Sequence, residues 1–183
     1  MIGGAFGVTL ASARDGNEAA FARIFRDVQP ALLRYLRVIA TDPEDVAGET
    51  WVQAVAGLRR FQGDEQDFRA WLFTIARNRA ADAGRSRARR PAVPLDMTEA
   101  AQQLTTPDAA DQALEAVSTH ATMALIKSLP PDQAEIIMLR VVAGLDTGNV
   151  ARIVGKSPGA VRVAAHRGLR RLAGQVAHAR VTL

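Results

Sequence analysis

Apolar residues recur every three or four positions along most of the chain, which is the spacing that places them on one face of an α-helix. The first such run covers residues 17–39, and its apolar face comprises Phe21, Ile24, Phe25, Val28, Leu32 and Leu36. Pro30 lies inside this run and is expected to kink the helix. The two-residue alternation of a half-buried β-strand is rare. The pattern therefore predicts an all-α protein.

Two further helices are predicted before residue 90, on either side of a polar turn. Thr41 or Asp42 would cap the second helix, and Pro43 would occupy its first position. This helix extends to about residue 60, and its buried side comprises Val46, Trp51, Val55 and Leu58. After a turn at 61–66, the third helix begins near Asp67, and its apolar stripe comprises Phe68, Trp71, Leu72 and Ile75.

Residues 91–107 interrupt the helical pattern with three prolines, a polar centre and no basic residue. Such a composition is typical of a linker between domains. We therefore predict two small helical domains, at 17–90 and 109–176, joined by a flexible linker at 91–108. The first sixteen residues are expected to be flexible, and residues 177–183 to form a C-terminal tail.

The second domain contains the strongest local motif. Its helices are predicted at about 108–128, 131–143, 146–154 and 158–176. The last two are joined by a tight turn, where Gly155 lets the backbone reverse, Ser157 caps and Pro158 starts the next helix. The apolar residues expected to hold these two helices together are Val150, Ala151, Val154, Val161 and Leu169. Such a pair forms a helix-turn-helix, which is a DNA-binding motif.

The charge distribution agrees with DNA binding. The formal net charge is +4, but residues 77–90 carry six basic residues against one acidic, and residues 140–183 carry eight against one. Residues 91–139 between them carry one against seven. Basic segments attract a polyanion such as DNA, although solvated helix faces would show the same charges. On the last helix the outward side comprises Arg162, His166, Arg167, Arg170 and Arg171, and the alternative there is a helical hairpin with a basic exterior.

Several other classes of protein are disfavoured by the sequence. It contains no cysteine, which excludes disulfides and thiolate-rich zinc sites. No two of its three histidines have metal-ligand spacing, and we find neither a glycine-rich phosphate loop nor a nucleophile–base pair. No segment approaches the roughly 18–20 apolar residues of a membrane span. We therefore expect a cytoplasmic protein that is not an enzyme, has no metal or other cofactor and does not insert into membranes.

Two stretches of sequence resemble the sigma-70 family of bacterial sigma factors. Residues 42–61 and 67–90 resemble conserved region 2, and residues 129–172 resemble region 4. The short intervening segment resembles the layout of the extracytoplasmic-function (ECF) group. This resemblance implies an alternative sigma factor that binds core RNA polymerase and directs promoter-specific transcription initiation, while the polymerase catalyses the phosphoryl transfer.

The resemblance also implies which residues bind polymerase. In the family the helix at 42–60 docks on the clamp helices of the largest subunit, and a further contact involves the β flap. The matching positions here are Asp45, Glu49, Trp51 and Gln53. The two acidic residues are four positions apart and so share one helix face. Gly48 stands where glutamine is usual and lowers helix propensity by roughly 1 kcal/mol.

For promoter DNA, the resemblance implies two sets of contacts. The −10 element would be read by the turn at 61–66, where a flipped base is bound, and by the third helix. Those residues are Gln62, Asp64, Arg77, Asn78, Arg79 and Arg85, with Gln66 as a further polar group in the turn. The −35 element would be read by the last helix through Arg162, Val163, His166, Arg167 and Arg170. Val163 stands where serine is usual, and Asn149 where glutamate is common.

A regulated ECF factor usually has an anti-sigma factor, so we expect one here. The alternative function is a dimeric helix-turn-helix regulator that does not replace a sigma factor and whose N-terminal domain is a sensor or dimerisation module. That alternative leaves the arginine block at the end of the third helix without a role.

Overall fold

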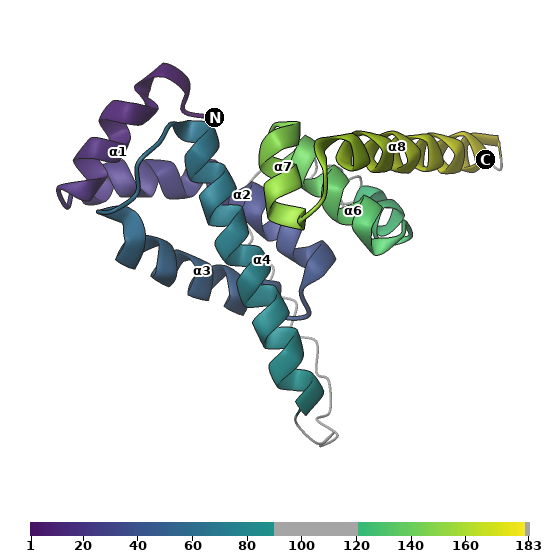
Figure 1. Cartoon of the computed structure of the whole chain (residues 1–183), viewed down its shortest axis with the longest axis horizontal. Coiled ribbons are helices and arrows are strands. Elements are labelled where there is room, and N and C mark those ends of the chain that lie inside the picture. The colour runs from purple at the N-terminus through teal and green to yellow at the C-terminus, as the bar shows by residue number, and fades with distance from the viewer. Residues whose placement is uncertain (90–120, 182–183) are drawn as a thin grey trace, which may run out of the picture.

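The computed structural model describes residues 1–89 and 121–181, and every regular element within them is helical (Figure 1). The prediction of an all-α fold is confirmed. The N-terminal part contains the 3₁₀ turn η1 (Gly3–Ala5), α1 (Phe6–Arg14), α2 (Glu18–Ile39), α3 (Pro43–Leu58) and α4 (Glu65–Arg89). The C-terminal part contains a helical stretch at 121–127, α6 (Pro131–Ile137), the π-helical turn η2 (Met138–Val142), α7 (Thr147–Val154) and α8 (Pro158–Val181). The predicted linker and most of the helix at 108–128 lie outside the described residues.

The N-terminal residues correct one expectation. Residues 1–16 were expected to be flexible, but α1 packs along α2 with Phe6 and Leu10 buried. The Phe6 ring lies 5.6 Å from that of Phe68 on α4. The backbone amides of Ile2 and Gly3 donate to the Glu65 carboxylate at 2.9 and 2.7 Å. The apolar spacing in this segment is helical, but the run is too short to predict a helix without its partners.

Helices α2, α3 and α4 form the body of the N-terminal domain. Asn17 caps α2, because its side chain accepts a hydrogen bond from the amide of Ala20 at 3.0 Å. Helix α2 runs on through Pro30 without a break. Asp42 precedes α3 but makes no capping hydrogen bond; its carboxylate pairs with Arg87 instead. Val55 was expected to be buried and is 53% exposed, because the α3 face that packs on α2 and α4 passes through Ala54 and Leu58.

The C-terminal domain contains the predicted helix-turn-helix, formed by α7 and α8. Gly155 ends α7 in a left-handed conformation with φ +68°, and the Ser157 hydroxyl accepts a hydrogen bond from the amide of Ala160 at 3.2 Å. Val161 is fully buried between the helices, as predicted, but Leu169 is 49% exposed. Helix α8 also continues beyond residue 176, where the sequence analysis ends it, to Val181.

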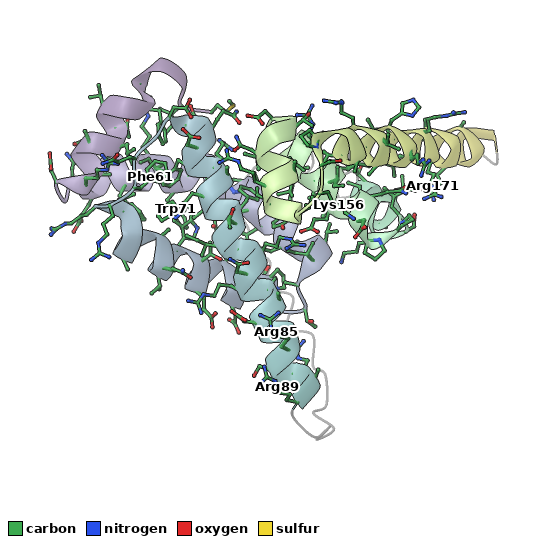
Figure 2. The ribbon with its side chains drawn as sticks, in the orientation of Figure 1. Phe61, Trp71, Arg85, Arg89, Lys156 and Arg171 are labelled. Atoms are coloured by element: carbon green, nitrogen blue, oxygen red, sulfur yellow. The ribbon has the colours of Figure 1, made fainter. Side chains whose placement is uncertain are left out.

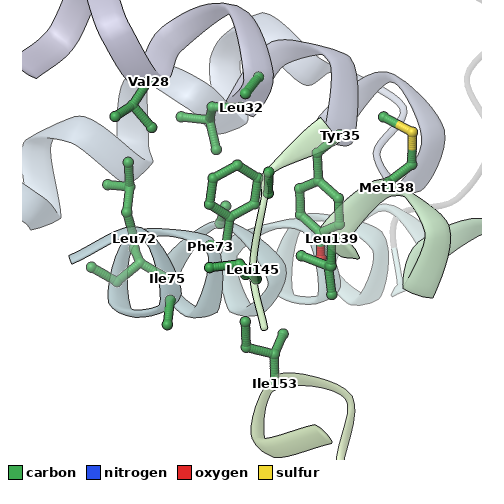
Figure 3. Packing of buried hydrophobic residues seen from close by; sticks show 14 of the residues in the cluster. Val28, Leu32, Tyr35, Leu72, Phe73, Ile75, Met138, Leu139, Leu145 and Ile153 are labelled. Carbon is green, nitrogen blue, oxygen red and sulfur yellow. The ribbon is translucent and has the colours of Figure 1, made fainter. Parts of the chain in front are cut away.

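The relative placement of the two domains was left open by the sequence, and in the structure they share one core. Helix α2 packs against α6 and η2, and α4 packs against α7. Figure 3 shows Tyr35 and Phe73 of the N-terminal domain beside Leu139 and Leu145 of the C-terminal domain. All four side chains are buried, so each domain covers apolar surface of the other.

Candidate nucleic-acid and polymerase interface

The predicted −35 residues form an exposed row on α8. Helix α8 leads away from the N-terminal domain (Figure 1). The side chains of the row are Arg162, Val163, His166, Arg167 and Arg170, and all are exposed. Between residues 158 and 177 the helix has no acidic residue, and no ion pair to this row is found in the described part of the chain. The arginines are therefore available as forked donors to base edges or phosphates.

Two neighbouring positions on α8 lie against α6 instead. Arg171, which the sequence placed on the outer side, donates to the Gln133 side chain of α6 at 2.8 Å (Figure 2). At Gly168 an added Cβ would lie 2.6 Å from Ile137 of α6. The small residues of α8 therefore serve, at Gly168, the close approach of another helix rather than of DNA.

The C-terminal end of α4 carries a second basic surface. Arg85 and Arg89 are exposed on its last turns, where α4 extends beyond the other helices (Figures 1 and 2). Arg85 pairs with Asp82 on its own helix, and Arg87 pairs with Asp42. Ion pairs between exposed side chains contribute roughly 0–1 kcal/mol, so a phosphate can replace these carboxylates at little cost.

The three consecutive residues Arg77, Asn78 and Arg79 point in different directions, because successive helical residues are rotated by about 100°. Arg77 donates to Glu135 of α6 at 2.7 Å. Asn78 is exposed. Arg79 donates to the Gln53 side chain of α3 at 2.9 Å. The structure therefore leaves only Asn78 of the three free of a side-chain partner among the described residues.

The contact between Arg77 and Glu135 affects the pKa values of Arg77 and of the neighbouring Tyr35. The hydrogen bond to the Glu135 carboxylate raises the pKa of the Arg77 guanidinium. Tyr35 donates its hydroxyl proton to the same carboxylate oxygen at 3.0 Å. Burial, and then the nearby Glu135 charge, hold the pKa of the Tyr35 hydroxyl well above its ordinary value. Both donors therefore stay protonated over the physiological range.

Two reciprocal hydrogen bonds hold the turn between α3 and α4. The Asp64 carboxylate accepts from the amide of Asp67 at 2.9 Å, and the Asp67 carboxylate accepts from the amide of Asp64 at 3.2 Å. Asp64 therefore caps the N-terminus of α4. Its predicted role was to contact the −10 element directly, and the sequence analysis gave no indication of this capping bond. Gly63 has φ +144°, and a Cβ there would lie 2.6 Å from that of Asp67, so the turn requires glycine.

The turn has two further polar side chains, Gln62 and Gln66, and only Gln66 forms a hydrogen bond within the described residues. Gln66 donates to the backbone oxygen of Gly144 in the C-terminal domain at 3.1 Å. Gln62 is exposed at the edge of a cleft of about 390 Å³ that lies between the two domains. The other residues that line this cleft are Asp67, Ala70, Trp71, Thr74, Asn149, Arg152 and Ile153.

Helix α3 presents the predicted polymerase-binding pair on one exposed stripe. Asp45 and Glu49 are exposed, and Val52, one turn further on, is 73% exposed. Val52 follows Glu49 by three residues and so lies on the same helix face, and this spacing is the signal in the sequence that could have indicated it. Gly48 lies on this stripe too, and an added Cβ there would meet open space.

Trp51 does not belong to this stripe. Its side chain is only 7% exposed and packs against Phe21 and Phe25, with ring centroids 5.8 and 5.0 Å away. The indole nitrogen donates to Gln29 at 2.6 Å. The interpretation of Trp51 as a docking residue is therefore wrong, because its side chain holds α3 on α2 from the inner face.

In the described part of the chain, no helix combines the length and apolarity needed to cross a bilayer.

Family models match both the N-terminal and the C-terminal domain of this chain. The family model for sigma-70 region 2 matches residues 24–90, and that for sigma-70 region 4 matches residues 119–172. The chain is 34% identical to the ECF RNA polymerase sigma factor SigD of Mycobacterium tuberculosis, over 96% of this chain and 86% of that protein. It is also 34% identical to the ECF RNA polymerase sigma factor ShbA of Streptomyces griseus, over 91% of this chain and 92% of the relative.

Solved structures show the same fold. CnrH, solved in complex with the cytosolic domain of CnrY, has a TM-score of 0.62 at 24% identity and covers 93% of this chain and 96% of its own. The sigma factor RpoE of Bartonella quintana, solved with the anti-sigma factor NepR, has a TM-score of 0.60 at 24% identity and covers 85% and 96%. The helical arrangement is thus one that proteins of distant sequence adopt.

Proposed function

The chain belongs to the extracytoplasmic-function group of the sigma-70 family and is an alternative sigma factor that directs transcription initiation; from this premise we propose which faces bind polymerase and which bind promoter DNA. Sigma factors are initiation factors rather than enzymes, and we propose that this chain likewise has no catalytic activity. Its place of action is then the bacterial cytoplasm, where the polymerase works.

The exposed stripe of α3 is the proposed polymerase-binding face. Asp45 and Glu49 offer two carboxylates to basic residues of the clamp helices, and Val52 adds apolar surface that can be buried in the contact. Gln53, which is exposed beside them, belongs to the edge of this face. The C-terminal domain provides the second contact, with the β flap.

Helix α4 and the turn before it form the proposed −10 face. Gln62 of the turn and Asn78 of the helix are exposed polar side chains with no hydrogen-bond partner among the described residues. Arg79 and Arg85 neutralise phosphates, and Arg77 does so once it leaves Glu135. Asp64 contributes by holding the shape of the turn rather than by contacting a base.

The exposed basic row of α8 is the proposed −35 face, and it is the observation that carries the DNA-binding assignment. Arg162 and His166 are one turn apart near the N-terminal half of the second helix of a helix-turn-helix, which is the part that enters the major groove. Val163 supplies an apolar contact, while Arg167 and Arg170 lie further along for bases or backbone.

An anti-sigma factor is a further proposed partner. Support comes from the sigma factor RpoE of Bartonella quintana, which has the same fold and was solved in complex with the anti-sigma factor NepR. A dimeric regulator that acts without polymerase receives no such support, because residues 24–90 match a sigma-factor region rather than a sensor module.

The test is reconstituted transcription with bacterial core polymerase, the purified protein and fragments of genomic DNA from its source organism. We expect discrete transcripts that require the protein and that start at a fixed distance below two shared promoter elements. Absence of such transcripts, together with tight DNA binding by the protein alone, would overturn the proposed assignment of faces.

A further inference from the structure

The carboxylate of Glu65, the first residue of α4, is bound by the N-terminal segment, residues 2–5. One of its oxygens accepts a hydrogen bond from the backbone amide of Ile2 at 2.9 Å, and the other accepts from that of Gly3 at 2.7 Å. The Glu65 side chain is only 12% exposed. The turn at 61–66 is therefore fastened, near its end, to the segment that precedes α1 (Figure 1).

The backbone of the N-terminal segment is shaped to bind a carboxylate. Ile2 has right-handed helical angles, with φ −73° and ψ −27°, and Gly3 has φ +67°. A right-handed residue followed by a left-handed one directs successive amides toward the same point, which creates an anion-binding concavity. Glu65 occupies this concavity. A Cβ at Gly3 would meet no atom within 4 Å, so glycine is needed there for its positive φ and not for space.

A buried arginine also attracts the Glu65 carboxylate. The Arg69 side chain is 5% exposed, and its Nε lies 3.6 Å from Glu65. That separation is too long for a hydrogen bond, so the attraction is electrostatic. Asp27 of α2 pairs with the same guanidinium. Because a buried guanidinium is costly without compensating charge, Glu65 and Asp27 together stabilise Arg69 and join the start of α4 to α2.

The other contacts of the turn fix its shape but not its position relative to α1. Asp64 and Asp67 each accept a hydrogen bond from the other's amide, and the Phe61 ring packs on that of Trp71 at 5.1 Å. These contacts lie within the turn and α4. Within residues 1–89, the hydrogen bonds between the turn and the segment before α1 are those of Glu65. The position of the turn therefore depends on this carboxylate.

The N-terminal segment and the turn meet at a cleft of about 550 Å³. Gly3, Phe6 and Gly7 line it from the N-terminal segment and α1, and Gly63 and Asp64 line it from the turn. The exposed side chain proposed to contact the −10 element, that of residue 62, directly precedes Gly63. A shift of the N-terminal segment would therefore change the surface beside the residues proposed to bind a flipped base.

We propose that Glu65 is a positioning residue for promoter recognition: the N-terminal segment holds Glu65, and Glu65 holds the turn where Gln62 can contact a base of the −10 element. Glu65 itself does not contact DNA, because its side chain is buried and both its oxygens accept from backbone amides. A side chain on a prepositioned turn loses less conformational freedom on binding, so discrimination between bases depends on the contact. The inference rests on the proposed assignment of the turn to the −10 element.

Two matched pairs of substitutions test the contact. Glu65→Ala removes the acceptor, and Glu18→Ala is its control, since Glu18 is an exposed acidic residue in the first turn of α2 and loses the same interaction with a helix N-terminus. Gly3→Ala distorts the concavity, and Gly4→Ala is its control. Neither added Cβ meets an atom within 4 Å, and only Gly3 has a positive φ.

The first experiment measures base discrimination at the −10 element by reconstituted holoenzyme. Two templates that differ in one −10 base compete in one reaction, so the ratio of their transcripts does not depend on the fraction of active protein. Each −10 position is substituted in turn. We expect Glu65→Ala and Gly3→Ala to reduce the ratio about 3- to 10-fold at the position that the turn contacts, with a smaller loss in Glu65→Gln, which keeps one acceptor oxygen.

The controls separate this effect from a loss of stability. Glu18→Ala and Gly4→Ala should keep the wild-type ratio, and templates that differ in the −35 element should give the wild-type ratio with every variant. A destabilised protein yields less of both transcripts but leaves their ratio unchanged. A wild-type −10 ratio in Glu65→Ala would therefore overturn the proposal.

Comparison of the two variants distinguishes positioning from direct contact with DNA. The double variant Gly3→Ala/Glu65→Ala should discriminate no worse than Glu65→Ala alone, because both substitutions break the same contact. Full discrimination in Gly3→Ala, or losses that add in the double variant, would show that Glu65 acts without the N-terminal segment and would refute the inference.

Amide hydrogen exchange, measured by nuclear magnetic resonance, checks the contact in the free protein. The amides of Ile2 and Gly3 should exchange faster in Glu65→Ala than in the wild type, while amides in the middle of α2 keep their rates. Equal rates at Ile2 and Gly3 would contradict the contact itself. Failure of the proposed function would look different, since transcription by the wild type would then not depend on any −10 base.

Discussion

Arg79 of α4 donates a hydrogen bond to the side chain of Gln53 of α3 at 2.9 Å, which links a residue assigned to the −10 face with one assigned to the polymerase face. Both side chains lie at the surface, so polymerase and DNA can each compete for them. The two faces therefore adjoin along the line where α3 packs on α4.

This pair gives the first prediction. Gln53→Ala removes the side chain that orients the Arg79 guanidinium, and it should slow formation of the open promoter complex by about 2- to 10-fold, which corresponds to a hydrogen bond of roughly 0.5–1.5 kcal/mol. A double-mutant cycle with Arg79→Ala measures the coupling between them. If the effects of the two single substitutions simply add, the bond has no role in initiation.

The acidic stripe of α3 gives the second prediction. Glu49→Lys should lower the affinity for core polymerase about tenfold, because it reverses a charge that faces basic residues of the partner. Affinity is measured by competition against a labelled sigma factor, with helical content checked by circular dichroism. Glu18→Lys makes the same charge change at an exposed position of α2 and should leave affinity unchanged; equal losses in both variants would point to net charge instead of a docking face.

The third prediction separates two arginines of α8. Arg167→Ala should weaken initiation at promoters that depend on the −35 element by roughly 1–3 kcal/mol. Arg171→Ala is the control, since that side chain is turned toward Gln133 of α6 at 2.8 Å. Transcript yields from promoters with and without an intact −35 element provide the measurement, and an Arg167→Ala variant as active as the wild type on both would remove this residue from the −35 face.

The fourth prediction concerns alkaline pH. Burial raises the pKa of Tyr35 well above its ordinary value, so the native state retains a proton that the unfolded chain releases near its ordinary pKa of 10.0. The stabilising effect is therefore complete below pH 10 and is lost as the pH rises above it. Tyr35 is the sole tyrosine, so its ionisation can be followed directly by tyrosinate absorbance.

A comparison variant isolates this effect from the titration of lysine and arginine. The melting temperature of the wild type should fall more steeply between about pH 9 and about pH 11, one unit on either side of the ordinary tyrosine pKa, than that of Tyr35→Phe. Parallel declines in the two proteins, or tyrosinate absorbance that appears at the ordinary pKa, would show that the Tyr35 hydroxyl is accessible to water.

The local signals in the sequence were sufficient for the helices and for the turn of the helix-turn-helix. The apolar period located α2, α3, α4 and α8, and Gly155, Ser157 and Pro158 located the turn between α7 and α8. These features depend on interactions between residues a few positions apart, such as capping and the φ angle of a glycine, and such interactions are encoded locally.

The same local signals failed for α1 and for Trp51. Helix α1 is nine residues long and is stabilised by contacts with α2 and α4, so its sequence alone does not predict it. For Trp51 the matching motif position suggested a surface role, while the apolar period suggested burial. The rings of Phe21 and Phe25, far away in sequence, decide the matter in favour of burial.

The sequence by itself determined that this chain is helical, which residues are basic or acidic, and which family they resemble. Only the tertiary structure decided the partners of the charged and polar groups: Arg77 with Glu135, Asp64 with Asp67, Gln66 with Gly144, and Arg171 with Gln133. The physical reason is that periodicity specifies the direction of a side chain around its own helix, whereas a hydrogen bond or ion pair requires two groups within about 3 Å, a distance that depends on how separate helices pack.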